Sequence, residues 1–511
     1  MDLTYNTIII GSGAGGGTLA HKLSESGEKI LILERGGFLP REKENWDPSS
    51  VFVKGRYNCG ETWYDQNEKP FVPGTHYFVG GNTKFYGAAL LRLREADFGE
   101  IEHYGGISPA WPLKYEDFQP YYQAAEELYE VHGQRGEDPT EPPEKSPYKY
   151  PPVSHEPIIK KIFHQLKEEG LKPFHLPLGI RLDEKRREKS LCIRCDTCDG
   201  YPCLADAKSD AHHICINQAL KQPNVTLLTH AKALRLNTDA MGAKVVDVEV
   251  EHEGSVKRFQ AKRFIVSCGA INSAALLLRS KSKLHPNGLA NSSGQVGRHY
   301  MCHTNSAIVA LSSEKNDVLF QKTIGINDFY HGADDSKYPL GHMQLLGKVK
   351  GAMLEGDAPF FTPRFILEKM ADFAIGWWIT SEDLPHADNR VLIDSSDRLH
   401  LHYTPTNLEA HRRLLEKLKK ILRKTGHRIH RFPNTAYLAK KIPIAGVAHQ
   451  VGTLRFGTDP KTSVLDLHCR AHDLDNLYAV DGSFFPSSGA VNPALTIIAN
   501  ALRVANYLRR S

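Results

Sequence analysis

The most constraining feature of this sequence is the stretch at residues 5–37, YNTIIIGSGAGGGTLAHKLSESGEKILILERGG. The apolar run at residues 7–10 is too short for a helix and ends at glycine, which predicts a buried strand. Gly11, Gly13 and Gly16 follow it as G-x-G-x-x-G. In such a motif the first glycine permits a tight turn and the second lets backbone approach a pyrophosphate. The third lets the next helix pack closely on the sheet.

The residues after the glycines complete a β–α–β pattern. Residues 18–26 predict a helix, whose N-terminus offers free N–H groups and a partial positive charge to a phosphate. Residues 29–33 predict a second buried strand, and Glu34 follows it, about 20 residues after the glycines, where a carboxylate suits a ribose hydroxyl. The stretch therefore predicts a dinucleotide site, with NAD, NADP and FAD as alternatives. A glycine-rich turn used only for packing is the competing interpretation.

Length and composition limit the class of protein. A chain of 511 residues suggests two or three domains. Basic residues are scattered and the net charge is only +5, which argues against nucleic acid binding. No apolar run reaches the roughly 18 residues of a transmembrane helix, and the first strand begins too early for a signal peptide to precede it. We therefore expect a cytoplasmic protein.

Two further segments share the character of the opening unit. Residues 263–280, RFIVSCGAINSAALLLRS, predict a strand, a turn and a helix that could join the first sheet. Residues 476–509 predict a strand that ends at Asp481 and Gly482, followed by a long apolar helix. Between them, residues 284–430 contain strand-like segments separated by loops. The expected fold is α/β, with a Rossmann-like domain and a second, mixed α/β domain.

Four separated blocks resemble the glucose–methanol–choline (GMC) family of flavin-dependent oxidoreductases. They are the opening unit, GGNTKFYG at 80–87, SCGAINSAALLL at 267–278, and the pair HQVGTLRFG at 449–457 and VDGSFFPSSGAVNPALTIIANAL at 480–502. The resemblance implies FAD as the dinucleotide. It also implies a discontinuous FAD-binding domain over residues 1–100, 190–300 and 440–511. Residues 101–189 and 301–439 would then form excursions and a substrate-binding domain with an antiparallel sheet.

The resemblance assigns roles to individual residues. The cofactor-binding positions that it implies are Gly11, Gly13, Ala14, Gly16, Glu34, Gly81, Asn82, Asp481, Gly482, Asn492 and Pro493. His449 falls on the catalytic histidine of the family, and Asn492 falls where the family has a second histidine or an asparagine. Some relatives attach FAD covalently through a histidine in the glycine-rich flavin segment. GGNTKFYG has none, so we expect non-covalent FAD.

The chemistry explains why these two residue types are suitable. Oxidation of a CH–OH group requires the hydroxyl proton to leave as hydride passes to the flavin, and a neutral imidazole can accept that proton near neutral pH. The Asn492 amide can orient the same oxygen without ionising. The alternatives are a structural role for His449 and a helix-capping role for Asn492, which precedes Pro493.

A cysteine cluster stands apart from these blocks. LCIRCDTCDGYPC places Cys192, Cys195, Cys198 and Cys203 in two C-x-x-C spacings and a fourth position. Three interpretations stay open: a loop of thiols near the active site, an iron–sulfur cluster, or a zinc site. Certain sugar dehydrogenases of the family carry an iron–sulfur cluster in a cysteine-rich stretch at a comparable place, although with different spacing.

The predicted function is therefore FAD-dependent oxidation of a CH–OH donor, with a sugar or glycoside hydroxyl as the first choice. Aromatic and hydrogen-bonding side chains in the expected substrate domain suit a carbohydrate; they include Trp377, Trp378, His342, Gln344 and His402. The alternatives are an aliphatic alcohol or sterol, a redox-neutral lyase or photoenzyme, and a non-catalytic FAD-binding protein. Oxygen, a quinone or a protein could accept the electrons, and the cysteines favour a dehydrogenase over an oxidase.

Overall fold

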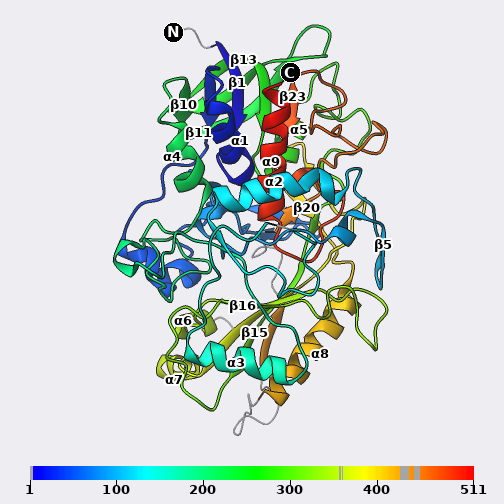
Figure 1. Cartoon of the computed structure of the whole chain (residues 1–511). Helices are drawn as coiled ribbons and strands as arrows, with labels where there is room; N and C mark the ends of the chain where they lie inside the picture. Colours follow the sequence, from blue (N-terminus) through cyan, green and yellow to red (C-terminus); the bar gives the residue numbers. More distant parts are fainter. Residues whose placement is uncertain are drawn as a thin grey trace.

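The protein is described by a computed structural model that covers residues 4–144, 146–355, 358, 361–425, 437–441 and 449–510. Its two largest sheets lie toward opposite ends of the molecule (Figure 1). We call them the upper and the lower sheet, as they appear in that view. No helix among the described residues has both the length and the apolar character needed to cross a bilayer.

The upper sheet has seven strands in the order β10-β2-β1-β13-β12-β11, with β23 beside β13. Their bounds are β1 (Thr4–Ile10), β2 (Ile30–Leu33), β10 (Val225–Leu228), β11 (Ala231–Thr238), β12 (Val245–His252), β13 (Ser255–Val266) and β23 (Leu477–Ala479). β10, β2, β1, β13 and β23 run parallel, and β12 and β11 extend the sheet antiparallel. β2 and the C-terminal ends of β1 and β13 are continuous apolar runs and fully buried, because both faces of such a parallel sheet are covered.

Helices cover this sheet. They are α1 (Ala14–Ser24), α5 (Ala270–Arg279) and α9 (Ala494–Leu508), together with α2 (Tyr115–Leu128), which packs on α9. Figure 1 shows α1, α9 and α2 grouped beside the strands, close to both chain ends. The hydroxyl groups of Tyr122 in α2 and Thr496 in α9 lie 2.8 Å apart.

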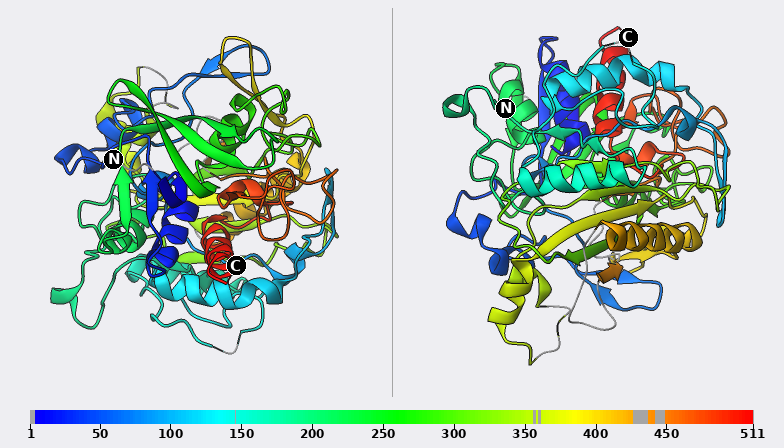
Figure 2. Two further views of the ribbon diagram at one scale, coloured as in Figure 1. Left: turned by 90° about the horizontal axis from the view of Figure 1, so that it is seen from above. Right: turned by 60° about the horizontal axis from the view of Figure 1, so that its bottom comes forward.

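The lower sheet is antiparallel and has six strands in the order β21-β15-β18-β17-β16-β8. Their bounds are β8 (Phe174–His175), β15 (Thr304–Leu311), β16 (Ile324–Ile326), β17 (His342–Leu345), β18 (Ala374–Ser381) and β21 (Tyr437–Lys441). The helices α3 (Pro157–Glu168) and α8 (Leu408–Lys424) lie beside it (Figure 2) and share an apolar core with it. Because side chains alternate across a strand, Trp377 enters this core while Trp378 turns to the opposite face.

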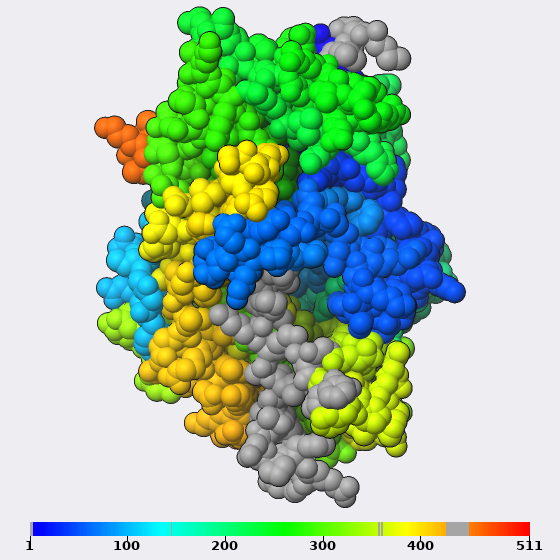
Figure 3. Space-filling model, turned by 180° about the vertical axis from the view of Figure 1, so that it is seen from behind, coloured from blue at the N-terminus to red at the C-terminus, as the bar shows by residue number. Residues whose placement is uncertain are grey.

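Smaller elements connect the two ends. A four-stranded sheet pairs β19 (Arg390–Ile393) and β20 (Leu399–His402) with β3 (Trp63–Asp65) and β4 (Pro70–Phe71). On the face shown in Figure 3, the blue stretch around β3 and β4 crosses between the green upper part and the yellow-green lower part. The remaining strands form pairs: β5 (Ile101–His103) with β6 (Gly106–Ser108), β7 (Val131–His132) with β9 (Leu178–Gly179), and β14 (Met301–Cys302) with β22 (Gln450–Val451). The other helices are α4 (Asn217–Ala219), α6 (Gly351–Leu354) and α7 (Arg364–Ala371).

The predicted fold class is confirmed, and the opening unit needs one adjustment. The helix expected over residues 18–26 is α1, which begins earlier, at Ala14, because Gly13 already serves as its N-cap. The segment at 263–280 joins the upper sheet through the parallel pairing of β13 with β1, as expected. The domain boundaries stay a prediction; α2, inside the 101–189 excursion, packs on α9 of the upper half.

Candidate active site

A cavity of about 1140 Å³ lies where the strands β1, β2, β13 and β23 end. Residues that follow these strands line one side, and residues of β17 and β18 in the lower sheet line another. Open α/β sheets bind ligands at the carboxyl ends of their strands. The cavity wall includes all but one of the predicted catalytic and cofactor-binding residues: Gly11, Gly13, Ala14, Glu34, Gly81, Asn82, His449, Asp481, Gly482, Asn492 and Pro493.

Gly16 is the exception, and the geometry of the three glycines explains why. A Cβ at Gly16 would lie 2.1 Å from the Gly11 carbonyl oxygen, so this glycine serves close packing of α1. Gly11 has φ +101°, and a Cβ there would lie 2.2 Å from the Ser267 carbonyl oxygen. A Cβ at Gly13 would meet no atom within 4 Å, because Gly13 faces the cavity. Gly13 therefore exposes backbone at the N-terminus of α1, where an anionic group is stabilised.

Glu34 is a buried carboxylate at the end of β2. One of its oxygens accepts hydrogen bonds from the Ser12 hydroxyl (2.6 Å) and the Ser12 N–H (3.1 Å), and the other accepts from the Gly36 N–H (3.0 Å). Burial raises the pKa of Glu34, and the bonds from Ser12 and Gly36 oppose this rise. A carboxylate has lone pairs to spare after three bonds, so Glu34 can also accept a hydroxyl from the cavity.

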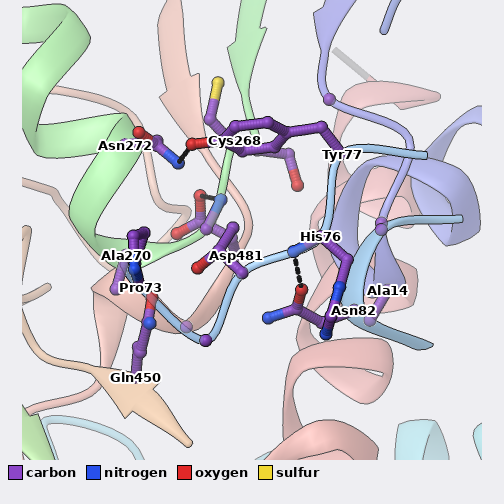
Figure 4. A pocket seen from close by; sticks show the side chains of 18 of the residues that line it. Ala14, Pro73, His76, Tyr77, Asn82, Cys268, Ala270, Asn272, Gln450 and Asp481 are labelled. Carbon is purple, nitrogen blue, oxygen red and sulfur yellow. Dashed lines mark hydrogen bonds between the residues drawn. The ribbon is translucent and has the colours of Figure 1, made fainter. Parts of the chain in front are cut away.

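The segment at Gly80–Asn82 runs beside the first glycines. The Gly80 N–H donates to the Ser12 hydroxyl (3.0 Å), and a Cβ at Gly81 would lie 3.1 Å from the Gly13 Cα. Figure 4 shows the Asn82 side chain turned to the backbone of His76, whose N–H donates to the Asn82 Oδ1 (2.9 Å). This contact fixes the segment along the cavity wall.

Lys84 anchors the same segment from behind. Its buried ammonium lies 2.9 Å from an Asp210 carboxylate oxygen and 3.4 Å from the Nδ1 atoms of His212 and His213. Asp210, His212 and His213 are the one group of three or more metal-ligand side chains, in the described part of the chain, whose ligand atoms lie within 4.8 Å of one another. The lysine supplies the positive charge at their centre, so this cluster is an internal ion pair network.

Asp481 is the second buried carboxylate of the cavity, and it projects toward its centre in Figure 4. It accepts hydrogen bonds from the N–H groups of Gly269 and Ser483, both at 2.9 Å, and from the Ser273 hydroxyl. Burial raises the pKa of Asp481, and the Ser273 and Ser483 bonds oppose this rise. The long cavity, the open N-terminus of α1 and the two fixed carboxylates fit an extended dinucleotide such as FAD.

His449 and Asn492 meet on the cavity wall. The Asn492 amide nitrogen lies 3.4 Å from the His449 Nε2. The His449 Nδ1 lies 3.0 Å from the Nδ1 of His303, and the centres of the His449 and Trp378 rings are 6.4 Å apart. Burial, together with the neighbouring imidazoles of His303 and His342, lowers the pKa of His449 to about 3. His449 is therefore neutral at physiological pH and able to accept a proton.

The cavity wall on the side of the lower sheet is aromatic and polar. Trp378, Gln344 and Asp199 line it. The Asp199 carboxylate pairs with the buried Lys322 ammonium and accepts from the Gly347 N–H. Among the other predicted substrate-domain residues, Trp377 and His342 are buried away from the cavity lining, and His402 lies outside it.

The cysteine cluster does not bring a zinc ligand set together in this structure, and its zinc interpretation stays untested. All four cysteines of the cluster are described, and no three of their sulfur atoms lie within 4.8 Å of one another, whereas ligands of one zinc ion surround it at about 2.3 Å. Burial raises the pKa of Cys192 to about 12, and burial also raises the pKa of Cys198. These values describe protonated thiols in a loop that contacts the cavity at Asp199 and Gly200.

Several cavity residues had no signal in the sequence. The Arg35 guanidinium lies 3.7 Å from the centre of the Tyr77 ring, and the Asn272 amide, labelled beside Tyr77 in Figure 4, donates to the Tyr77 hydroxyl (3.3 Å). Asp199 lies inside the cysteine-rich stretch but was not marked as a site residue, and His303, which contacts His449 without lining the cavity, belongs to no motif named above. Position was the available signal for two of these residues, since Arg35 directly follows Glu34 and Asp199 directly follows Cys198.

Comparisons with known proteins agree with this geometry. Two family models described as GMC oxidoreductase match residues 14–305 and 385–501. The chain is 31% identical to 6'''-hydroxyparomomycin C oxidase of Streptomyces lividus, over 99% of this chain and 92% of that protein. It is also 31% identical to paromamine 6'-oxidase of Streptomyces fradiae, over 99% and 91%.

A solved structure supports the fold. Pyridoxine 4-oxidase from Mesorbium loti superposes with a TM-score of 0.67 over 99% of both chains, at 19% identity. The two family models together cover most of the chain. They include the cavity-wall residues discussed above, except residues 11–13, Gln344 and Trp378. The chain therefore belongs to the GMC oxidoreductase family, a family of FAD-binding flavoenzymes.

Proposed function

We propose that this protein oxidises a CH–OH group of a carbohydrate, with FAD as its cofactor, His449 as general base and Asn492 as the group that orients the substrate oxygen. The observation that carries the proposal is the pair itself. The His449 Nε2 and the Asn492 amide lie 3.4 Å apart on the wall of a cavity whose other end holds the glycine turn and Glu34.

The protein's contribution to the reaction is to bind, orient and accept a proton. A hydroxyl placed between His449 and Asn492 can donate to the imidazole nitrogen and accept from the amide. The neutral His449 then takes the hydroxyl proton as the C–H bond breaks. Bound FAD supplies the oxidising power, by accepting the hydride from that carbon.

The cofactor would lie along the cavity without a covalent bond. Gly13 and Ala14 would face its pyrophosphate and Glu34 its adenosine ribose. Gly81, Asn82, Asp481, Gly482 and Pro493 would line the rest of its length, while Gly16 keeps α1 close to the sheet. The domain division implied by the family resemblance is part of this proposal, because the residues around the cavity come from all three of its FAD-binding segments.

A carbohydrate is favoured over an aliphatic alcohol or a sterol for two reasons. The substrate side of the cavity offers the Trp378 ring with Gln344 and Asp199, and flat rings with hydrogen-bonding groups suit sugars. The two relatives at 31% identity are named for aminoglycosides. An amino-sugar glycoside is therefore the first substrate to test, and oxygen is the first acceptor, ahead of the quinone or protein acceptor that the cysteines suggested.

The test is an anaerobic screen of sugars, amino-sugar glycosides, aliphatic alcohols and sterols, in which the absorbance of the bound flavin is monitored. Bleaching by a carbohydrate in the wild type, but not in His449→Gln, is the expected result. If no alcohol bleaches the flavin, the redox-neutral alternative is favoured. Admission of air then separates an oxidase, whose flavin is reoxidised quickly, from a dehydrogenase.

The iron–sulfur interpretation of Cys192, Cys195, Cys198 and Cys203 stays a prediction with its own measurement. Iron analysis of anaerobically purified protein, with the visible spectrum after subtraction of the flavin, tests it. Iron below one atom per chain would leave the thiol loop as the interpretation.

A further inference from the structure

His303 lies behind the proposed base and contacts it directly. β14 and β22 pair antiparallel, with Cys302 opposite Gln450. The next position of this register places His303 opposite His449, and their Nδ1 atoms are 3.0 Å apart although 146 residues separate them in the chain. His303 is buried, and its Nε2 lies 3.4 Å from the Ser488 carbonyl oxygen.

The hydrogen-bonding partners determine which nitrogen of each ring carries the proton. A carbonyl oxygen can only accept, so the His303 Nε2 must donate to Ser488. Burial lowers the pKa of His303 to about 4, so its ring is neutral and its Nδ1 has no hydrogen. The contact between the two Nδ1 atoms then needs a hydrogen from His449. A neutral His449 with its proton on Nδ1 has a bare lone pair on Nε2, the nitrogen that Asn492 faces.

The geometry points to His303 as a positioning residue that holds His449 in the one tautomer able to act as a base toward the cavity. This inference rests on the proposed function for its consequence in the reaction, but not for the tautomer itself. The Ser488 carbonyl accepts from the His303 Nε2, and the His303 Nδ1 accepts from the His449 Nδ1. The His449 Nε2 then faces the substrate with a free lone pair. With the opposite tautomer, an N–H would face the substrate hydroxyl and could not remove its proton.

The surroundings of the pair contain few other charges. His342 faces His449, and burial lowers the pKa of His342 to about 4, so it is neutral. Glu382 influences His303 from the far side, where its carboxylate accepts from the Gly489 N–H and the Ser108 hydroxyl. In the described part of the chain, neither His303 nor His449 takes part in an ion pair with a charged side chain. The tautomer is therefore set by the donor and acceptor pattern rather than by an ion pair.

The first test is spectroscopic and independent of turnover. The ¹⁵N chemical shifts of histidine-labelled holoenzyme in the solid state separate protonated from unprotonated ring nitrogens, and the difference spectrum against His449→Gln assigns those of His449. We expect a protonated Nδ1 and an unprotonated Nε2. A protonated Nε2 on His449 in the wild type overturns the inference.

The second test compares two substitutions that change the side-chain shape similarly, one without and one with a hydrogen-bond acceptor. His303→Leu removes the acceptor, whereas His303→Asn keeps an oxygen near the position of Nδ1. We expect His303→Leu to move the His449 proton toward Nε2 and to slow flavin reduction by roughly 10²- to 10³-fold, within the range of lost base catalysis. His303→Asn should recover at least a tenth of the wild-type rate with the wild-type tautomer.

The outcomes separate this inference from the proposed function. Retention of the wild-type tautomer and rate in His303→Leu overturns it. If His303→Leu does not fold, as judged by flavin content and circular dichroism, the wild-type spectrum and His303→Asn decide. If His449→Gln keeps the wild-type rate, the proposed function is wrong. The ¹⁵N spectrum of the wild type still tests the tautomer of His449 independently.

Discussion

Substitutions at the glycines of the opening motif should impair either FAD binding or fold stability, and the sharpest comparison is Gly13→Ala with Gly16→Ala. At Gly13 a methyl group would meet no protein atom within 4 Å, and φ is −70°, which alanine adopts freely. The cost to the fold is the weaker helix N-cap, about 1 kcal/mol. The methyl group would instead occupy space that the FAD pyrophosphate needs. Loss of one hydrogen bond to a charged group is worth about 1.5–3 kcal/mol, or a roughly 10- to 150-fold weaker Kd.

Gly16→Ala should show the reverse pattern. Its methyl group would lie 2.1 Å from the Gly11 carbonyl oxygen and 3.1 Å from the Ser267 Cβ, well inside the normal contact distance. Helix α1 would have to move away from β1, and overpacking of this kind costs about 1–3 kcal/mol or more. The free energy of unfolding should therefore fall in Gly16→Ala.

Two measurements distinguish these variants. Urea unfolding of the FAD-free proteins gives the cost to the fold, and titration with FAD, followed by flavin fluorescence, gives the Kd. Gly13→Ala should unfold within about 1 kcal/mol of the wild type and bind FAD more weakly. Wild-type affinity in Gly13→Ala, or wild-type stability in Gly16→Ala, would refute the assignment of Gly13 to the cofactor and Gly16 to packing.

The remaining predictions concern the base, the ion pair and the substrate face. His449→Gln should slow flavin reduction by about 10²–10⁴ with unchanged flavin content in stopped-flow experiments; a rate within twofold of wild type would contradict this. Because burial lowers the pKa of His449 to about 3, the acid limb of that rate should lie nearer pH 3 than pH 6.5, and a midpoint near 6.5 in the pH profile would be wrong for a buried base. Below about pH 6.5 the unfolded chain protonates His449 whereas the folded protein does not, so the free energy of unfolding should be highest above pH 6.5 and decline as the pH falls toward 3. Urea unfolding at pH 7 and pH 5 measures this decline, and a decline in wild type no larger than that in His449→Gln would contradict it. Lys84→Met should cost about 3–5 kcal/mol in urea unfolding because it removes the ammonium paired with the buried Asp210 carboxylate, which then keeps its bonds to His213, and adding Asp210→Asn should recover part of that loss. Trp378→Leu should raise KM for a carbohydrate in steady-state assays while the flavin content stays unchanged, and an unaltered KM would remove Trp378 from the substrate site.

Much of the cofactor-binding half could be predicted from sequence because its determinants are local. A strand, three glycines, a helix and a carboxylate lie within residues 5–37, and the chain geometry of one β–α–β unit leaves few arrangements for them. Glu34 reaches Ser12 because both lie within two residues of the ends of the paired parallel strands β1 and β2. The resemblance to the GMC family then identified FAD and marked His449 and Asn492, which local patterns alone would not have distinguished from other polar residues.

The substrate side depends on contacts that no local pattern encodes. Trp377 and Trp378 are neighbours in the sequence, yet one lies in the apolar core and the other on the cavity wall, because the pairing of β18 with β15 and β17 decides which face of the strand is covered. His303 meets His449 across 146 residues only through the β14–β22 pairing. The sequence by itself thus determined the fold class and the predicted position of a dinucleotide site. Tertiary structure alone decided which side chains surround the base, since that is set by register between distant strands.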